Sequence, residues 1–253
     1  MKVAAVAVPV LAGLASASPV DIEARQSCPG VHVFGARETT APAGYGTSQG
    51  LVNMVTQAYS GATSEAINYP ACGGQSQCGG VSYENSASQG TQAVVSAVNS
   101  FNQRCPNTKI VLIGYSQGGQ IMDNALCGGA GATLSGNALA AVKAAIFMGD
   151  PHNVNGLPYN VGTCRAGGVS TFVLCFRKTP TLDRRTRLTT NKQFAARPSG
   201  FQCSPAKPAI IQSYCDSTDP YCCNGNDANS HQQYVNKYGS QALAFIKKLV
   251  DAA

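Results

Sequence analysis

Short apolar and β-branched runs alternate along the chain with segments whose apolar residues recur at helical spacing. The runs that predict β-strands lie at residues 31–37, 65–70, 109–115, 143–150 and 209–216. The third of them, KIVLIGY, is apolar almost throughout, which is typical of a parallel strand buried on both faces. Five strands are therefore expected, spaced widely enough for helical connections between them.

The connecting segments carry the helical pattern. Apolar residues three and four positions apart predict helices around 94–101 and 121–126, and a further helix at 240–250. In the last of these, Leu243, Ile246 and Leu249 share one face, while Lys247 and Lys248 lie opposite. Strands that alternate with helices predict the α/β class, with a parallel sheet covered by helices on both faces.

The N-terminal region has the pattern of an export signal. Residues 1–17 contain one lysine, an apolar run and small residues at the end, and the run is too short to span a bilayer. Residues 18–25 are predicted to be a short propeptide that ends at Arg25, which leaves 26–253 as a single domain. No other apolar run approaches the ~18 residues of a membrane helix. We therefore expect a secreted, extracellular protein with no membrane contact.

The eleven cysteines fit an oxidising compartment. Ten of them form an even set, and Cys175 is the odd one. Cys215, Cys222, Cys223 and His231 could hold a metal by residue type, but their spacing matches no familiar zinc pattern, and disulfide-bonded cysteines cannot ligate as thiolates. Disulfides are expected, with no metal and no cofactor.

One pentapeptide carries candidate chemistry. Residues Gly114 to Gly118 read Gly-Tyr-Ser-Gln-Gly, directly after the most strand-like run and directly before a helical pattern. This context is that of a nucleophile elbow, in which small flanking residues permit a sharp turn that lifts the serine above the sheet edge. The helix that follows directs its N-terminal N–H groups at developing negative charge. Ser116 is the predicted nucleophile.

A serine nucleophile needs a base, and the base needs a carboxylate to orient it. Of the three histidines, His32 lies inside the first strand and His152 follows the fourth. Only His231 has carboxylates of a suitable loop between itself and Ser116, in the chain order Ser, acid, His of α/β-hydrolases. The residues alone leave the acid open. Its candidates are Asp216, Asp219 and Asp227, the last of which could simply cap a helix.

Several longer segments together resemble one family. The segments HVFGARETTAPAGYG, INYPACGGQSQCGG, KIVLIGYSQGGQIMD, AAIFMGDP and SYCDSTDPYCCNGNDANSHQQY are similar to those of the fungal acetylxylan esterases related to cutinases, carbohydrate esterase family five. The similarity runs from about Cys28 to Val250, apart from a basic stretch at Val169–Gln193. It implies a three-layer α/β sandwich of the cutinase-like α/β-hydrolase type, with a central five-stranded parallel sheet and an open site. It also implies a serine esterase that removes acetyl groups from acetylated xylan through an acyl-enzyme. The alternative is a cutinase-type hydrolase of lipid polyester or short-chain esters.

The resemblance also assigns residues. It places the nucleophile on Ser116, the base on His231 and the acid on Asp219, which stands four residues after Cys215 and three before Cys222. It places the oxyanion donors on Thr39 and on the backbone N–H of Gln117. The implied disulfides are Cys28–Cys105 and Cys215–Cys222, and Cys72–Cys78 is a local expectation. The pairing of the others stays open, namely that of Cys127, Cys164, Cys203 and Cys223.

The loops near these residues favour a sugar substrate. Residues 224–230, NGNDANS, contain no large apolar side chain, and Tyr45 and Tyr221 could offer both a flat face and a hydroxyl to a sugar. Acetylated xylan or its oligosaccharides are therefore the expected partner of a monomeric enzyme. Nucleic acid is not expected, because the one basic stretch has no aromatic interleaving apart from Phe172 and Phe176.

That basic stretch, Val169–Gln193, differs from the rest of the chain. Its six Lys/Arg residues and single acid carry +5 of the chain's net charge of +6. It can be interpreted as a solvated insertion loop or as a patch for acidic glucuronoxylan. However, a 25-residue loop without structure of its own is uncommon in a compact domain.

A third interpretation is a retained, in-frame intron. Deleting Val169–Gln193 leaves GTCRAGGFAARPSGFQC, which restores the pattern of the related enzymes and removes the odd Cys175. The codons for Val169 to Thr171 can supply an intron start, those for Leu188 and Thr189 a branch site, and that for Gln193 the acceptor.

Overall fold

The computed structural model describes residues 27–167, 196–198 and 200–253. The predicted signal peptide, the predicted propeptide and the basic stretch 169–193 lie outside these residues.

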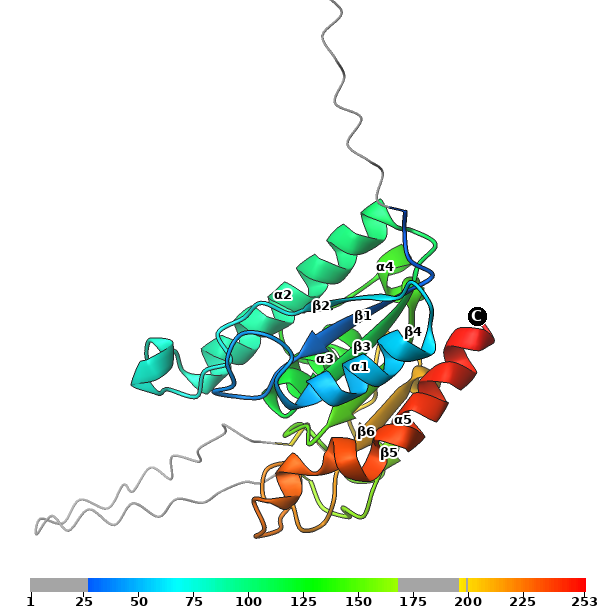
Figure 1. The fold of residues 1–253 in the computed structure, drawn as a ribbon. Helices are drawn as coiled ribbons and strands as arrows, with labels where there is room; N and C mark the ends of the chain where they lie inside the picture. The colour runs from blue at the N-terminus through cyan, green and yellow to red at the C-terminus, as the bar shows by residue number, and fades with distance from the viewer. Residues whose placement is uncertain (1–26, 168–195, 199) are drawn as a thin grey trace, which may run out of the picture.

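One fully parallel sheet forms the centre of the molecule, in the strand order β2-β1-β3-β4-β6-β5 (Figure 1). The strands are β1 (Val31–Ala36), β2 (Thr63–Ala66), β3 (Lys109–Tyr115), β4 (Val142–Met148), β5 (Asn160–Val161) and β6 (Ile211–Tyr214). The expected parallel sheet is confirmed, but the expected number of five strands is wrong. The additional strand β5 has two residues at the sheet edge, too few to show an apolar period in the sequence.

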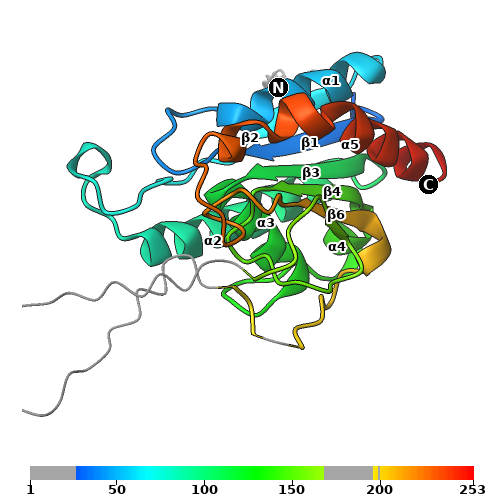
Figure 2. The same ribbon diagram turned by 90° about the horizontal axis from the view of Figure 1, so that it is seen from below.

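Helices cover both faces of the sheet (Figures 1 and 2). On one face lie α1 (Gln49–Ala58) and α5 (Tyr234–Asp251), and on the other α2 (Tyr83–Arg104), α3 (Gln117–Cys127) and α4 (Gly136–Ala141). The predicted helices fall within α2, α3 and α5, whereas the short α1 and α4 were not predicted. Among the described residues, no helix combines the length and the apolar character needed to cross a bilayer.

The four strands β1, β3, β4 and β6 each contribute side chains to two apolar cores. In β3, Ile110 and Leu112 pack toward α2 and α3, while Val111 and Ile113 pack toward α1 and α5. All four side chains are fully buried. Side chains alternate along a strand, so an uninterrupted apolar run is what a strand between two helical layers requires. This explains why KIVLIGY was the clearest strand signal in the sequence.

The strand order places a crevice at one end of the sheet. The chain adds β2 on one side of β1 and then places β3 on the other, so the order reverses between β1 and β3. In open α/β sheets, ligands bind beyond the carboxyl ends of the strands at such a reversal. Thr39 follows β1 and Ser116 follows β3, and both therefore lie at this position.

Five disulfides pair all ten cysteines of the described residues. They are Cys28–Cys105, Cys72–Cys78, Cys127–Cys203, Cys164–Cys223 and Cys215–Cys222. The first, second and last are the expected pairs, and the other two complete the pairing that the sequence left open. A crosslink between Cys127 and Cys203, which lie 76 positions apart, is worth about 4.5 kcal/mol in the chain-entropy account.

Candidate active site

Ser116 stands on a sharp turn between β3 and α3. Its backbone φ is 53° and its ψ −121°, a conformation that L-residues rarely adopt. Gly114 and Gly118 make the turn sterically feasible, since a Cβ on Gly114 would clash with the Gly118 carbonyl and one on Gly118 with the Ala36 carbonyl. The Ser116 N–H donates to the Met148 carbonyl at 2.8 Å, which ties the turn to β4. The spacing of the pentapeptide is thus set by close backbone packing.

His231 and Asp219 form a buried pair. Nδ1 of His231 lies 2.6 Å from Oδ2 of Asp219, whose side chain has no solvent exposure. The other oxygen of Asp219 accepts the N–H groups of Tyr221 at 2.7 Å and Cys222 at 3.3 Å. Gly149 lies against the ring, and a Cβ there would stand 2.7 Å from Cε1 of His231. The imidazole is thus held on one edge by a carboxylate and on another by a residue without a side chain.

These contacts keep Asp219 ionised. Burial by itself would raise the pKa of this carboxyl, but hydrogen bonding and charge attraction from His231, together with the Tyr221 N–H and the Tyr234 hydroxyl, lower it below the ordinary value. An ionised carboxylate fixes the Nδ1–H tautomer of the imidazole and leaves Nε2 as the proton acceptor.

Ser116 and His231 line the same pocket, whose volume is about 260 Å³. Within the described part of the chain, the structure contains no hydrogen bond between the two side chains. In unliganded sites such bonds are often long and shorten only when substrate binds. The pocket residues are Glu38, Thr39, Thr40, Gln75, Ser116, Tyr221, His231 and Gln232.

The expected oxyanion donors come from the loop after β1 and from the first residue of α3. Thr39 follows β1 and lines the pocket, and Gln117 opens α3. The Gln117 side chain is buried, with its oxygen accepting from Ser86 Oγ at 2.9 Å and its amide donating to the Cys72 carbonyl at 3.1 Å. These contacts hold the first turn of α3 in place, so that its N–H groups are directed at the crevice.

Residues with strained backbone conformations lie at or next to the Ser116 pocket. The non-glycine residues with positive φ in the described chain are Thr40, Ala71 and Ser116. The first two are joined directly, because the Thr40 N–H donates to the Ala71 carbonyl at 2.7 Å. Strain of this kind persists where the surrounding structure over-determines it, typically at functional sites.

The other acids that the sequence offered lie in different environments. Asp216 is 5% exposed and binds Lys237 Nζ at 2.7 Å, the Tyr238 hydroxyl and Thr163, away from the imidazole. Asp227 accepts the N–H of Asn229 in the turn before His231, which is a local capping contact. Neither carboxylate makes a hydrogen bond to His231 in the described chain.

The other histidines also have separate surroundings. His32 accepts or donates a hydrogen bond with Thr63 at 2.7 Å and stacks on Phe101, and burial followed by the charge of Arg104 lowers its pKa to about 4. His152 lines a different, smaller pocket between α2 and α3, and burial lowers its pKa to about 3. Neither lines the pocket of Ser116.

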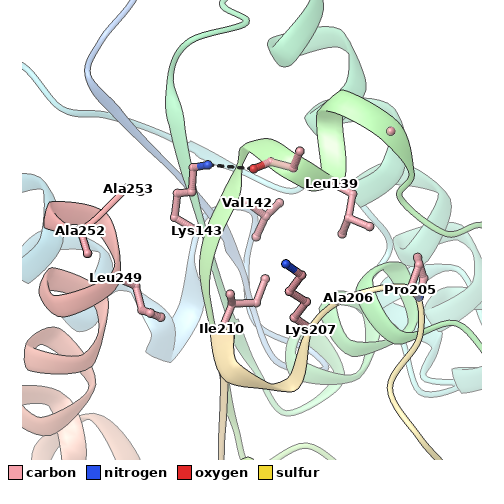
Figure 3. Close-up of a pocket in the computed structure, with 12 residues that line it drawn as sticks. Leu139, Val142, Lys143, Pro205, Ala206, Lys207, Ile210, Leu249, Ala252 and Ala253 are labelled. Atoms are coloured by element: carbon pink, nitrogen blue, oxygen red, sulfur yellow. Dashed lines mark hydrogen bonds between the residues drawn. The ribbon is translucent and has the colours of Figure 1, made fainter.

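Two further features of the structure hold no catalytic chemistry. Cys164, Cys215 and Cys223 lie close enough together to suggest a metal, but all three are disulfide-bonded and have no thiolate to offer. A larger cavity of about 550 Å³ lies at the amino ends of β4 and β6 (Figure 3). Its lining includes Val142, Ile210 and Leu249 with two lysines at its edge, and no serine, histidine or carboxylate side chain among the described residues.

Two tyrosines of the site were missed in the sequence. Tyr115 donates its hydroxyl to the His231 carbonyl at 2.7 Å, and Tyr234 donates to Asp219 Oδ2 at 2.7 Å. Tyr115 stands inside the pentapeptide, but a strand of a buried sheet gives no sign of what its aromatic residue contacts. Of the tyrosines expected at the rim, Tyr221 lines the pocket, whereas Tyr45 packs on Gly35 and bonds to Ser64.

This fold, with a serine on a strained strand-to-helix turn beside a His–Asp pair, is that of an α/β-hydrolase.

The family model named Cutinase matches residues 27–250. The chain is 55% identical over 243 residues to acetylxylan esterase 2 of Talaromyces purpureogenus, covering 92% of each protein. It is 53% identical over 252 residues to cutinase 11 of Verticillium dahliae, covering 96% of this chain and 76% of that protein. A solved acetylxylan esterase structure at 0.90 Å resolution superposes with a TM-score of 0.76 at 55% identity, covering 88% of this chain and 100% of that one. The chain belongs to the cutinase family of serine carboxylic-ester hydrolases.

Proposed function

We propose that the protein is a secreted serine esterase that removes acetyl groups from acetylated xylan. Ser116 is the nucleophile, His231 the base and Asp219 the carboxylate that orients it. The acyl-enzyme forms on Ser116. All of these groups belong to one chain, so the proposed reaction needs no residue of a second subunit.

The lining of the pocket is the observation that carries this proposal. The side chains around Ser116 are polar or charged, with Glu38, Gln75 and Gln232 among them. Among the described residues that line the pocket, Tyr221 is the one aromatic side chain besides the imidazole of His231. A long acyl chain would strip water from these polar groups without gaining apolar contact, whereas an acetyl methyl requires little apolar surface. The site therefore favours short acyl groups over those of a lipid polyester.

The geometry supports a two-step reaction. His231 Nε2 takes the proton of Ser116 Oγ as that oxygen attacks the acetyl carbonyl carbon, and Asp219 stabilises the imidazolium that forms. The backbone N–H of Gln117 and Thr39 stabilise the negative oxygen. His231 then returns the proton to the departing sugar hydroxyl, and a water molecule activated by the same imidazole hydrolyses the acetyl-enzyme.

The surface on the leaving-group side suits a sugar chain. The Tyr221 ring lies over His231, with ring centroids 4.6 Å apart, and offers a flat face beside the nucleophile. The adjoining segment 224–230 is polar. Aromatic faces bordered by hydrogen-bonding groups are well matched to carbohydrate rings.

Acyl-chain selectivity tests the proposal against the cutinase-type alternative. We expect kcat/KM for p-nitrophenyl acetate to exceed that for p-nitrophenyl laurate by about 100-fold, because the polar lining gains nothing from additional methylenes. Both rates are measured with one preparation whose active sites are titrated with an organophosphate. Faster hydrolysis of the laurate ester would support the cutinase-type alternative. Failure of the organophosphate to label the protein would instead indicate a non-catalytic carbohydrate-binding protein.

We also infer that Val169–Gln193 derives from a retained intron and is absent from the secreted enzyme. The described residues on either side of it contact one turn, since Asn153 Nδ2 donates to the Ala166 carbonyl at 3.5 Å and the Arg197 N–H donates to the His152 carbonyl at 3.3 Å. A Cβ on Gly167 would lie 3.1 Å from that of Ala196. A chain that goes directly from Gly168 to Phe194 would therefore have only a short distance to cover.

Mass spectrometry of the protein secreted by its source organism tests this inference. We expect a tryptic peptide that joins Gly168 to Phe194, and a mature protein 25 residues shorter than residues 26–253 of the sequence. Deleting Val169–Gln193 from the recombinant chain is expected to leave kcat/KM for p-nitrophenyl acetate within about twofold, because none of the proposed catalytic residues lies in this stretch. Detection of the internal peptide Thr179–Arg184 in the secreted protein would overturn the inference.

A further inference from the structure

Two hydrogen-bond donors converge on one oxygen of Asp219. His231 Nδ1 lies 2.6 Å from Oδ2, and the Tyr234 hydroxyl lies 2.7 Å from the same oxygen. Tyr234 is 1% exposed, so no bulk water competes for this contact. The residue comes from the first turn of α5, three positions after His231. The carboxylate therefore shares its charge between the base and a second, permanent partner.

The direction of the tyrosine hydrogen bond follows from its neighbours. The backbone N–H of Asp216 donates to the Tyr234 hydroxyl oxygen at 2.9 Å. An N–H can only donate, so the hydroxyl proton is left for an acceptor. The Asp219 carboxylate at 2.7 Å is a stronger acceptor than the disulfide sulfur of Cys222 at 3.3 Å. Burial and the Asp219 charge also raise the pKa of Tyr234 far above its ordinary value. The tyrosine hydroxyl thus stays protonated and remains a donor around neutral pH.

We propose that Tyr234 is a positioning residue that sets the basicity of His231 through Asp219. This inference rests on the proposed function of the site. The tyrosine hydroxyl takes up part of the negative charge on Oδ2, so the carboxylate stabilises the imidazolium less strongly than it would alone. The hydroxyl also fixes the orientation of the Asp219 carboxylate, which in turn fixes the orientation of the imidazole. His231 is thereby kept weak enough to return its proton to the leaving hydroxyl.

The other titratable groups near the Tyr234–Asp219 hydrogen bond are Asp216, Lys237, Tyr238 and Tyr115, and each has hydrogen-bond partners of its own. The Asp216 carboxylate is bonded to Lys237 and Tyr238 on the same helix and to Thr163. On the strand side, the Tyr115 hydroxyl accepts the Tyr234 N–H at 3.2 Å and donates to the His231 carbonyl. Other titratable groups at the pocket are Glu38 and Tyr221. None of these contacts involves the Tyr234 hydroxyl, so removing that hydroxyl directly affects its bond to Asp219 and the Asp216 N–H, which loses its acceptor.

The test is the pH dependence of Tyr234→Phe beside that of Tyr238→Phe. The control removes a hydroxyl from the same helix, and that hydroxyl donates to Asp216 rather than to Asp219. For Tyr234→Phe we expect the acid limb of kcat/KM for p-nitrophenyl acetate to move to higher pH by about 0.5 pH unit. The Asp219 carboxylate has then lost one hydrogen-bond donor, so its negative charge stabilises the His231 imidazolium more strongly. We expect kcat on the plateau to fall about tenfold because the imidazole is held less firmly. Tyr238→Phe should leave the acid limb unchanged.

Incorporation of 3-fluorotyrosine at position 234 provides a second variant that keeps the ring and its hydroxyl. Its more acidic hydroxyl donates more strongly, so the acid limb should move to lower pH, opposite to Tyr234→Phe. If neither variant moves the limb, or if Tyr234→Phe lowers Tm and rate with the limb in place, the tyrosine has only a structural role and the inference is overturned. Ser116→Ala separates this failure from that of the proposed function, because activity in Ser116→Ala would contradict the catalytic assignment itself.

Discussion

Ser116→Ala is expected to lower kcat on acetyl esters by about a millionfold, the cost of removing the nucleophile from a triad that acts as a unit. The substitution removes one oxygen from a side chain that is 8% exposed. In the described structure that oxygen makes no hydrogen bond, so its loss leaves no buried group without a partner. The strained φ of 53° is retained, because alanine meets the same steric limits as serine.

The measurement is single-turnover hydrolysis of p-nitrophenyl acetate, with thermal unfolding as the control for folding. We expect a Tm within a few degrees of the wild type, since a change of about 0.5 kcal/mol is the norm for a substitution that breaks no contact. Hydrolysis within tenfold of the wild-type rate would show that another residue is the nucleophile.

Asp219→Asn is expected to lower kcat by about ten-thousandfold, because an amide at this position favours the wrong imidazole tautomer. The carboxylate accepts from His231 Nδ1, so that Nε2 faces the pocket without a proton. An asparagine can instead donate its N–H to Nδ1, which places the imidazole proton on Nε2. The base could then no longer accept the proton of Ser116.

Asp216→Asn is the matched control for this substitution. Asp216 is buried in the same loop, three residues from Asp219, but its carboxylate binds Lys237, Tyr238 and Thr163. Hydrogen bonds from these groups outweigh burial and lower its pKa, so its charge contributes to stability above the unfolded-state pKa, and this contribution is lost as the pH falls through the folded-state pKa. We expect Asp216→Asn to lower Tm while kcat stays within about tenfold of the wild type. A larger loss of kcat in Asp216→Asn than in Asp219→Asn would reverse the assignment of the acid.

The sequence predicted those parts of the fold that rest on long apolar periods. The run at 109–115 lies in β3 as expected, and the helical patterns lie in α2, α3 and α5. Strand β2 was expected at 65–70 but spans Thr63–Ala66, because its side chains are mostly exposed and give little pattern. Whether a segment as short as β5 forms a strand depends on its pairing with the neighbouring strand β6 rather than on a pattern in its own two residues.

At the site, the strand-to-helix turn that carries Ser116 could be predicted, because the glycines around it are needed for close backbone packing and such local requirements are visible in sequence. The acid could not be chosen from the residues alone, since Asp216 and Asp219 share one loop. Only the fold shows that the first binds Lys237 and the second His231. The pairs Cys127–Cys203 and Cys164–Cys223 likewise depend on how distant loops meet.

The central claim is tested most directly by comparing the acetate released from acetylated xylan with the hydroxy fatty acids released from cutin. Both are measured at equal concentrations of organophosphate-titrated enzyme, and Ser116→Ala serves as the blank. Acetate release from xylan that depends on Ser116, with no release from cutin above the blank, is the predicted result. Serine-dependent release from cutin without acetate release from xylan would contradict it.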